Sequence, residues 1–154
     1  MARLPFLTRM VMKLDVWSVR LTGGSFFMWL FAQRTGLARD PELKNRKAPA
    51  LVLTTTGRKS GRRRSVVLPY FTFDGQTFVV GSKGGAPEDP DWVSNLRKTP
   101  DALIYMSRRS STVTTRFADP AERSRLWQQL VRFAPTYDGY QQATRREIPL
   151  VIIG

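Results

Sequence analysis

The sequence predicts an α+β protein built on a small barrel of about six mainly antiparallel strands. Strand-like apolar runs bounded by turn residues follow one another from residue 50 onward. Asp74-Gly75 is a strong hairpin signal within that region. The helix-like segments are short, and their alternation with strands is too irregular for a doubly wound parallel sheet. The 154 residues suit one domain, and we expect a helical segment over 1–49 and the barrel over 50–154.

The strands are expected from the change in apolar periodicity after Pro49. Asp74-Gly75 joins the second and third of them, and Arg108-Arg109-Ser110 is the expected turn between the fourth and fifth. The expected ranges are 51–56, 65–73, 76–81, 102–107, 112–117 and 148–153.

The helices are expected from spacing and from capping residues. Residues 6–21 carry apolar side chains at helical spacing on a basic background, which is typical of an amphipathic helix. Asp89 before Pro90, and Asp119 before Pro120, have the pattern of N-caps followed by a first helical residue. The further expected helices are 26–31, about 90–98, about 120–133 and 136–143.

The composition limits the chemistry. The net charge of +13 indicates an acidic partner such as nucleic acid, anionic lipid or a polyanionic ligand. The chain has no cysteine and no histidine, which excludes disulfides, thiolate nucleophiles, histidine bases and nearly all zinc sites, so we expect no metal. If the protein is an enzyme, a bound cofactor supplies most of its chemistry.

No membrane-spanning helix or signal peptide is predicted. The longest apolar run covers residues 26–32, far short of the roughly 20 residues that cross a bilayer. Arg9 and Lys13 interrupt the N-terminal apolar pattern. We therefore expect a cytoplasmic protein.

The segment TTTGRKSGRRR, residues 54–64, is strongly basic and lies between two expected strands. One interpretation is a nucleic-acid patch, although no helix-turn-helix or zinc-finger pattern accompanies it. Another is a cradle for one compact anion, because glycines at 57 and 61 allow close backbone approach and cations can surround a phosphate or carboxylates. A solvated hairpin tip is the third.

A second loop, GSKGGAPEDPDWVSNL at residues 81–96, favours the cradle. Lys83 lies among glycines, and the helix that follows offers free amide groups at its start. Trp92 and Asn95 lie three residues apart and share one helix face. Trp92 is also explained by packing in the core, whereas the amide of Asn95 is costly to bury without a partner.

These two loops, with LPYF and PTYDGYQQATRREIPLVII, resemble the actinobacterial deazaflavin-dependent nitroreductase family. The resemblance covers residues 50–153. It implies a split β-barrel related to flavin reductases and the coenzyme F420 in its reduced form. That coenzyme carries a phosphate and an oligoglutamate tail, so the basic loop would be its cradle.

The resemblance also implies the residues of the cofactor site. Arg58, Lys59, Ser60 and Arg64 would hold the phosphate end. Ser65, Val66, Val67, Leu68 and Pro69 would line the deazaflavin ring with backbone groups. Val80, Gly81, Ser82 and Lys83 would contact another part of the cofactor, and Trp92 and Asn95 would close the pocket.

Substrate residues are implied in the same way. Tyr137 and Tyr140 would form the substrate wall, and Ser82, a tyrosine or water would supply a proton after hydride transfer. Packing of the short helix on the barrel is the alternative role of the two tyrosines. Ala134 stands where the family's nitroreductase has a further tyrosine, which puts reduction of bicyclic nitroimidazoles in doubt and suggests a different pocket shape.

The expected acceptor is a small molecule: a quinone, or an activated alkene such as an enone or unsaturated lactone, or a nitro compound. The helix at 6–21 could lie on an anionic membrane surface, pack on the barrel or cover the pocket. The expected assembly is a monomer or a homodimer. The alternatives are a reductase that uses FMN, and a basic module that binds nucleic acid without catalysis.

Overall fold

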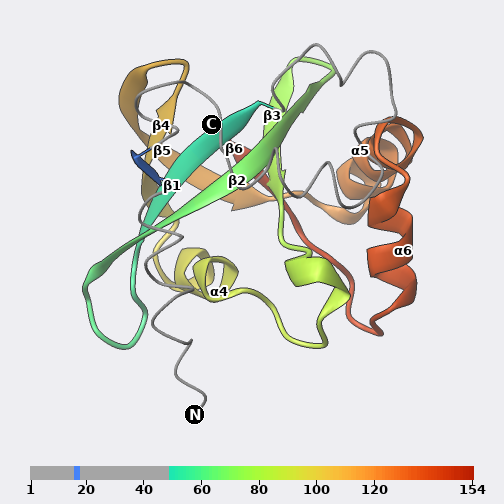
Figure 1. The fold of residues 1–154 in the computed structure, drawn as a ribbon, viewed down its shortest axis with the longest axis horizontal. Coiled ribbons are helices and arrows are strands. Elements are labelled where there is room, and N and C mark those ends of the chain that lie inside the picture. The colour runs from blue at the N-terminus through green and yellow to red at the C-terminus, as the bar shows by residue number, and fades with distance from the viewer. Residues whose placement is uncertain (1–15, 18–48) are drawn as a thin grey trace.

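The computed structural model describes residues 16–17 and 49–154, and six strands in this part form a closed barrel (Figure 1). Their order around the barrel is β1-β2-β3-β6-β5-β4, and every neighbouring pair is antiparallel. The predicted fold class is confirmed. The strands are β1 Ala50–Thr56, β2 Arg63–Phe73, β3 Gln76–Val80, β4 Asp101–Met106, β5 Arg109–Phe117 and β6 Leu150–Ile153. The helices are α4 Asp91–Lys98, α5 Pro120–Phe133 and α6 Thr136–Gln142, with a short 3₁₀ turn, η2, at Lys83–Gly85.

The barrel is split because its two long strands each belong to two sheets. Strand β2 pairs with β1 through residues 63–69 and then with β3 through residues 70–73. Strand β5 pairs with β4 through residues 109–114 and then with β6 through residues 115–117. Over residues 63–69, one edge of β2 therefore has no strand partner among the described strands.

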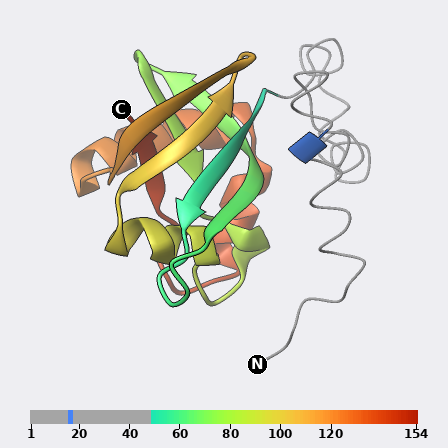
Figure 2. The same cartoon turned by 90° about the vertical axis from the view of Figure 1, so that its left-hand side faces the viewer.

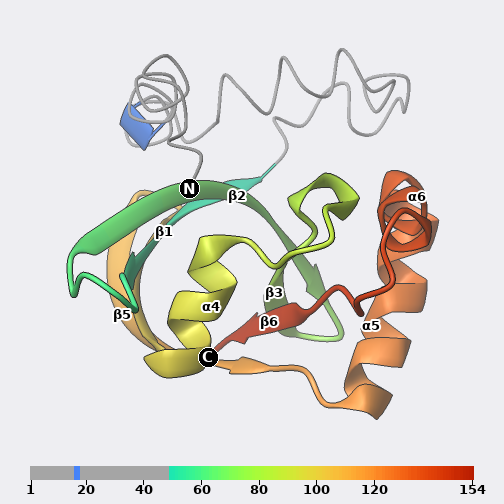
Figure 3. The ribbon, with the colours of Figure 1, turned by 90° about the horizontal axis from the view of Figure 1, so that it is seen from below.

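The barrel interior holds the main core, and α4 closes one end of it. Figure 3 shows α4 inside the ring of strands when the molecule is seen from below. Its apolar residues Trp92, Val93 and Leu96 are buried against Leu51 and Leu53 of β1 and other interior side chains. Helix α4 is thus anchored by side chains that leave water on one face.

A second core lies outside the barrel, where α5 covers the outer face of β3 and β6 (Figure 1). Leu126 and Leu130 of α5 pack there against Phe78 and Ile152. Asp119 caps α5 as predicted, since its Oδ1 accepts a hydrogen bond from the backbone N–H of Glu122 at 2.9 Å. Helix α6 continues alongside α5 and brings Tyr137 and Tyr140 to this cluster.

Several predicted boundaries differ from the structure by one to three residues, and two of these differences have a clear physical cause. Helix α4 begins at Asp91 with Pro90 as its N-cap, because the carboxylate of Asp89 is taken up by arginine side chains and not by helix amides. The turn between β4 and β5 lies at Ser107-Arg108, whose φ angles of 50° and 64° give a two-residue turn. Two-residue turns with positive φ match the twist of the flanking strands. This turn could not be located from the sequence because neither residue is the usual glycine or asparagine.

The N-terminal expectations lie almost wholly outside the described residues. The helix at 26–31 is outside them, and of residues 6–21 only Val16 and Trp17 are described, both helical. Val16 packs against Ala50 and Val52 on the outer face of β1, and Trp17 is 66% exposed. Among the described residues, no helix is both long and apolar enough to cross a membrane.

Candidate cofactor and substrate site

The loop between β1 and β2 is closed by its own backbone. Gly57 N–H donates to Arg62 O at 2.8 Å, and Gly61 N–H donates to Gly57 O at 2.8 Å. Gly61 has a φ of +65°, a conformation that L side chains rarely adopt. Ser60 Oγ accepts from Arg62 N–H at 3.3 Å, so its own hydroxyl proton is still available to a ligand. The backbone of residues 57–62 therefore closes on itself, and its side chains point outward.

Helix α4 holds this loop through Arg58. Asn95 Oδ1 accepts from Arg58 N–H at 3.0 Å, and Lys98 Nζ donates to Arg58 O at 2.8 Å. The Arg58 guanidinium pairs with the exposed carboxylate of Asp91 at 3.1 Å. Among the cations proposed for the phosphate, Arg58 is thus the one that pairs with a carboxylate in the described part of the chain. That partner is exposed and weakly bound, so an anionic ligand can replace it.

Asn95 and Trp92 lie inside the fold and not on an open pocket wall. Asn95 is 5% exposed, and its Nδ2 donates to Thr55 Oγ1 at 3.0 Å while its Oδ1 holds Arg58. Trp92 is 7% exposed and packs in the barrel core. Asn95 thus supports the basic loop from a buried position, and Trp92 anchors α4 in the barrel. Their predicted role in closing the cofactor pocket stays a prediction.

Four cations of this loop region remain exposed and make no ion pair with a carboxylate in the described part of the chain. They are Lys59, Arg62, Arg63 and Arg64. The sequence interpretation named Lys59 and Arg64 and omitted Arg62 and Arg63. The signal for these two was the unbroken arginine run itself.

Strand alternation divides residues 65–69 between two faces of β2. Val66 and Leu68 pack against the barrel core, whereas Val67 packs against the outer cluster at Ala50 and Val52. Ser65 Oγ lies 2.8 Å from Thr54 Oγ1, and either atom can be the donor. Ser65, Val67 and Pro69 therefore share the outer face, whereas the side chains of Val66 and Leu68 point into the barrel core.

The edge of β2 that has no strand partner among the described strands also presents backbone groups. Tyr70 N–H donates to Pro49 O, at the β1 side of the strand. Because peptide groups alternate along a strand, those of Ser65, Val67 and Pro69 turn to the edge that lacks a strand partner among the described strands. Backbone contacts from this edge to a flat ring stay a prediction.

The loop between β3 and α4, residues 81–90, is packed tightly. A Cβ on Gly81 would lie 2.8 Å from Pro149 Cγ, and one on Gly85 would lie 2.8 Å from the backbone oxygen of Tyr140. Lys83 has a φ of 47°, and its Nζ lies 3.9 Å from a Glu88 carboxylate oxygen. Ser82 is partly buried, and Val80 is buried in the outer core. Of the four residues predicted from 80–83, Ser82 and Lys83 are thus the two that are not buried.

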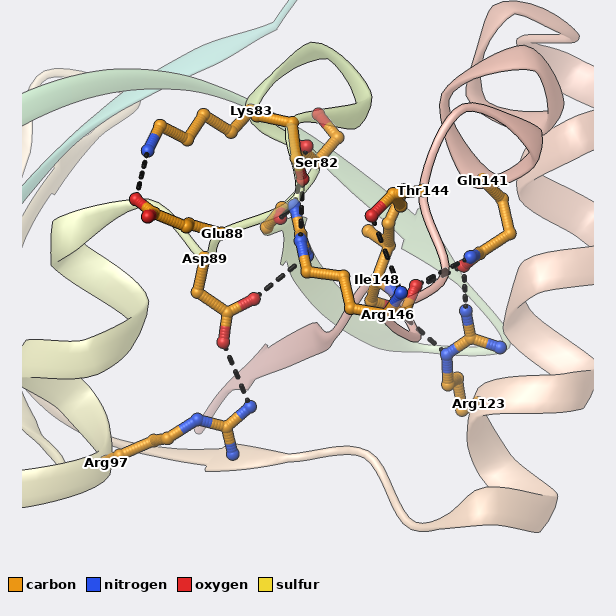
Figure 4. A network of polar contacts seen from close by, with 12 residues as sticks. Ser82, Lys83, Glu88, Asp89, Arg97, Arg123, Gln141, Thr144, Arg146 and Ile148 are labelled. Carbon is orange, nitrogen blue, oxygen red and sulfur yellow. Dashed lines mark hydrogen bonds and ion pairs between the residues drawn. The ribbon is translucent and has the colours of Figure 1, made fainter.

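Arg146 holds this loop and was missed by the sequence interpretation (Figure 4). Its guanidinium donates to the carbonyl oxygens of Gly81, Ser82 and Ala86 at 2.8 to 3.1 Å, and it pairs with Asp89 at 2.9 Å. The only signal was an arginine placed four residues before the start of the final apolar strand, which does not reveal a partner 60 residues away.

The tyrosines of α6 lie edge to face in an aromatic cluster. Tyr137 and Tyr140 rings are 5.7 Å apart, and Tyr137 lies 5.6 Å from Phe71 of β2. Burial, with a smaller contribution from Tyr140, raises the pKa of the Tyr137 hydroxyl, and burial raises the pKa of Tyr140. Both hydroxyls therefore keep their protons at neutral pH and can donate hydrogen bonds. Ala134 is buried at the end of α5.

Helix α4 and the two loops bring the candidate residues into one region. The second loop leads directly into α4, whose side chains hold the first loop, and Gly85 lies against α6. The basic hairpin projects on the side away from α5 and α6 (Figures 1 and 3). The arrangement can bind an elongated ligand with its anionic end at the hairpin and a flat part along the β2 edge, near the tyrosines.

The comparisons with known proteins point to a class of cofactor-dependent reductases. The model of the F420H(2)-dependent quinone reductase family matches residues 31–154. The chain belongs to this family, and the expected relationship to F420-dependent reductases is confirmed.

Individual relatives support the assignment. An F420H(2)-dependent quinone reductase of Mycobacterium tuberculosis is 36% identical over 108 residues, which cover 68% of this chain and 72% of that protein. A solved F420-H2 dependent reductase, FDR-A, has 34% identity and a TM-score of 0.61, covering 69% of this chain and 94% of that one. Another structure, described as a domain-swapped dimer, has 30% identity and a TM-score of 0.62, covering 84% of this chain and all of that one.

Proposed function

We propose that this chain transfers a hydride from reduced F420 to a quinone. The observation that carries the proposal is the pairing of four exposed loop cations with an unpaired β2 edge beside two protonated tyrosines. Membership of the quinone reductase family supports both the cofactor and the acceptor.

The described residues fit the cofactor on chemical grounds. Its phosphate and oligoglutamate tail require several cations, and Lys59, Arg62, Arg63 and Arg64 carry no competing ion pair with a described carboxylate. Its flat ring requires a surface with peptide donors and acceptors, which the edge at 65–69 provides. FMN has one phosphate, so it would leave most of these cations without a partner.

When bound, the reduced coenzyme supplies the hydride, and the protein supplies position. The β2 edge and Ser82 and Lys83 hold the ring, and Tyr137 and Tyr140 place the acceptor against it. The acceptor takes two electrons and one proton with the hydride, and a quinone needs one further proton to become a hydroquinone.

That proton has several candidate routes. Ser82, Tyr137, Tyr140 and water are the candidates, and the Tyr137 hydroxyl, which keeps its proton at neutral pH, can also donate a hydrogen bond to the acceptor oxygen. Replacing Tyr137 by Phe should raise the KM for the acceptor more than it changes affinity for the coenzyme.

A titration tests the core of the proposal. Coenzyme fluorescence is followed as purified protein is added, and turnover is then measured with menadione, cyclohexenone and a nitroaromatic compound. Micromolar or tighter affinity with fastest turnover of menadione is the expected result. Faster turnover of cyclohexenone or of the nitro compound would move the acceptor to the enone or nitro class. Absence of coenzyme binding would refute the proposal, and yellow flavin-containing protein would favour FMN.

Contact with an anionic membrane is a finer part of the proposal. It would bring the site close to a lipid-soluble quinone. The exposed indole of Trp17 and the net charge of +13 support it. Cosedimentation with vesicles that contain anionic lipid tests it, and Trp17→Ala should weaken binding. Equal recovery with neutral vesicles would contradict it.

A further inference from the structure

Arg146 connects the two halves of the proposed site. Its side chain is 15% exposed, and each of its three nitrogens donates to the loop between β3 and α4. Nη2 contacts Gly81 O at 3.1 Å and Ser82 O at 2.8 Å, and Nε contacts Ala86 O at 2.9 Å. A planar guanidinium can make such a set of directed bonds, whereas a lysine ammonium cannot reproduce it.

The backbone at Arg146 and just after it is fixed by α6. Gln141 Nε2 donates to Arg146 O at 2.8 Å, and Gln141 Oε1 accepts from Ile148 N–H at 3.0 Å. Arg123 of α5 donates to the same Gln141 oxygen and to Ile148 O (Figure 4). Arg146 therefore extends from a segment that is bound to the helix carrying Tyr137 and Tyr140.

The far end of the loop is held through a shared carboxylate. Asp89 Oδ1 accepts from Arg146 at 2.9 Å, and its Oδ2 pairs with Arg97 of α4 at 3.4 Å. Arg97 in turn lies over the ring of Phe117 at 4.3 Å. The loop is thus fastened at its start and middle by Arg146 and at its end by Arg146 and Arg97 together.

Close packing leaves the loop little room to adjust. The backbone oxygen of Tyr140 is 2.8 Å from where a Cβ on Gly85 would lie, so the loop touches α6 directly. Arg146 thus links the loop between β3 and α4 to the α6 side through hydrogen bonds. Gly85 links the same loop to α6 through close packing.

We propose that Arg146 is a positioning residue: it fixes Ser82 and Lys83 on the cofactor side relative to Tyr137 and Tyr140 on the acceptor side. The inference rests on the proposed function, because it assigns these residues to the two reactants. It implies that loss of Arg146 lowers the rate of hydride transfer by misplacing one reactant against the other, in addition to any effect on stability.

The neighbouring arginine provides the matched control. Arg145 is exposed and makes no hydrogen bond or ion pair with another described residue. Arg145→Ala and Arg146→Ala remove the same charge from the same segment, so they weaken long-range attraction of a polyanionic coenzyme equally. Any difference between them reports the contacts of Arg146.

The test measures coenzyme affinity, kcat and KM for wild type, Arg145→Ala, Arg146→Ala and Arg146→Lys, well below each unfolding temperature. We expect Arg146→Ala to lower kcat by about 10- to 100-fold. Arg145→Ala should change kcat by less than about twofold, and Arg146→Lys should fall between them, since it keeps the charge and loses the fork of hydrogen bonds. Equal kcat in the two alanine variants would overturn the proposal.

Hydrogen exchange tests whether Arg146 fixes the loop, and this test does not depend on the proposed function. Amides of residues 81–89 should exchange faster in Arg146→Ala than in Arg145→Ala, while the strands stay protected in both. That result would hold even if the wild type bound no F420, which would refute the function but not the fixation of the loop. If Arg146→Ala does not fold, Asp89→Asn and Arg146→Lys replace it, and unchanged loop exchange and kcat in both would overturn the proposal.

Discussion

The loop between β1 and β2 and the loop between β3 and α4 both combine glycines with cations, yet they differ in what the cations contact. In the first loop and at the start of β2, four cations are exposed and make no ion pair with a described carboxylate. In the second, Lys83 lies near Glu88, and Arg146 and Arg97 share Asp89. The first loop keeps positive charge available, and the second uses it to fix its own shape.

The difference suggests a division of labour within one site. Charge that must attract a polyanion has to stay unpaired, because an internal carboxylate would compete with the ligand. Groups that set the geometry of a reaction have to be held, which requires directed hydrogen bonds and close packing. Affinity should therefore depend mainly on the first loop and rate mainly on the second.

Two positive-φ glycines, one from each loop, should show the largest contrast in stability. A Cβ at position 61 would lie in open space, so Gly61→Ala should lower the free energy of unfolding by only about 1 kcal/mol, through backbone strain. Gly85→Ala adds a contact with the Tyr140 backbone at 2.8 Å and should cost about 3 kcal/mol. Urea unfolding of both variants measures the difference, and equal losses would show that the second loop is not tightly packed.

Asn95 should show the next largest effect, because it supports the first loop from a buried position. Asn95→Ala leaves Thr55 and the N–H of Arg58 without their partner and should cost about 2 kcal/mol. Lys98→Ala removes an exposed contact to the same residue, Arg58, and should cost less than about 0.5 kcal/mol. Unfolding free energies test this pair, and a loss at Lys98 as large as at Asn95 would count against a buried support.

Much of the barrel could be predicted because its signals are local. Asp74-Gly75 and the cap at Asp119 are chemical signals that act within four residues, and both were identified correctly. The turn at Ser107-Arg108 was misplaced because the pairing of β4 with β5 imposes positive φ on residues with no preference for it. The start of α4 was wrong by one residue because distant arginines compete for Asp89.

The site was predictable only in its exposed parts. Loop composition indicated where Lys59, Arg64, Ser82 and Lys83 lie, but it could not tell a free cation from a paired one such as Arg58. Arg146 contacts residues about 60 positions away in the chain, and no spacing rule reveals such a contact. The interior positions of Trp92 and Asn95 depend on α4 entering the barrel, which follows from the closed topology.

The ion pair between Arg116 and Glu122 lies far from both loops and shows how much a fixed charge contributes to the free energy of unfolding. Hydrogen bonds from Arg116, at 2.5 and 2.8 Å, hold the pKa of Glu122 at about 2, below its usual value of 4.5, and Gln76 adds a further contact. A lowered pKa stabilises the fold above pH 4.5, and this contribution is lost as the pH falls toward 2. Glu122→Gln should therefore cost about 1.5 kcal/mol at pH 7 and less at pH 3, measured by urea unfolding. A cost that is equal at both values would contradict the ion pair.

The free cations should have the smallest effect on stability and a clear effect on binding. Arg62→Gln with Arg63→Gln should change the unfolding free energy by less than about 0.5 kcal/mol, since neither side chain is paired with a described carboxylate. Affinity for F420 should fall by about tenfold at low salt, with the difference from wild type shrinking as salt screens the charges. Fluorescence titration at two ionic strengths measures both effects.

Arg108→Gln with Arg109→Gln is the control for net charge. The register of β1 with β4 places that hairpin turn at the opposite end of β1 from the basic loop. The control should therefore lower affinity by less than about twofold. An equal loss in the two double variants would mean that F420 responds to the overall charge of +13 and not to the loop, and the contrast between the two loops would then fail as an account of binding.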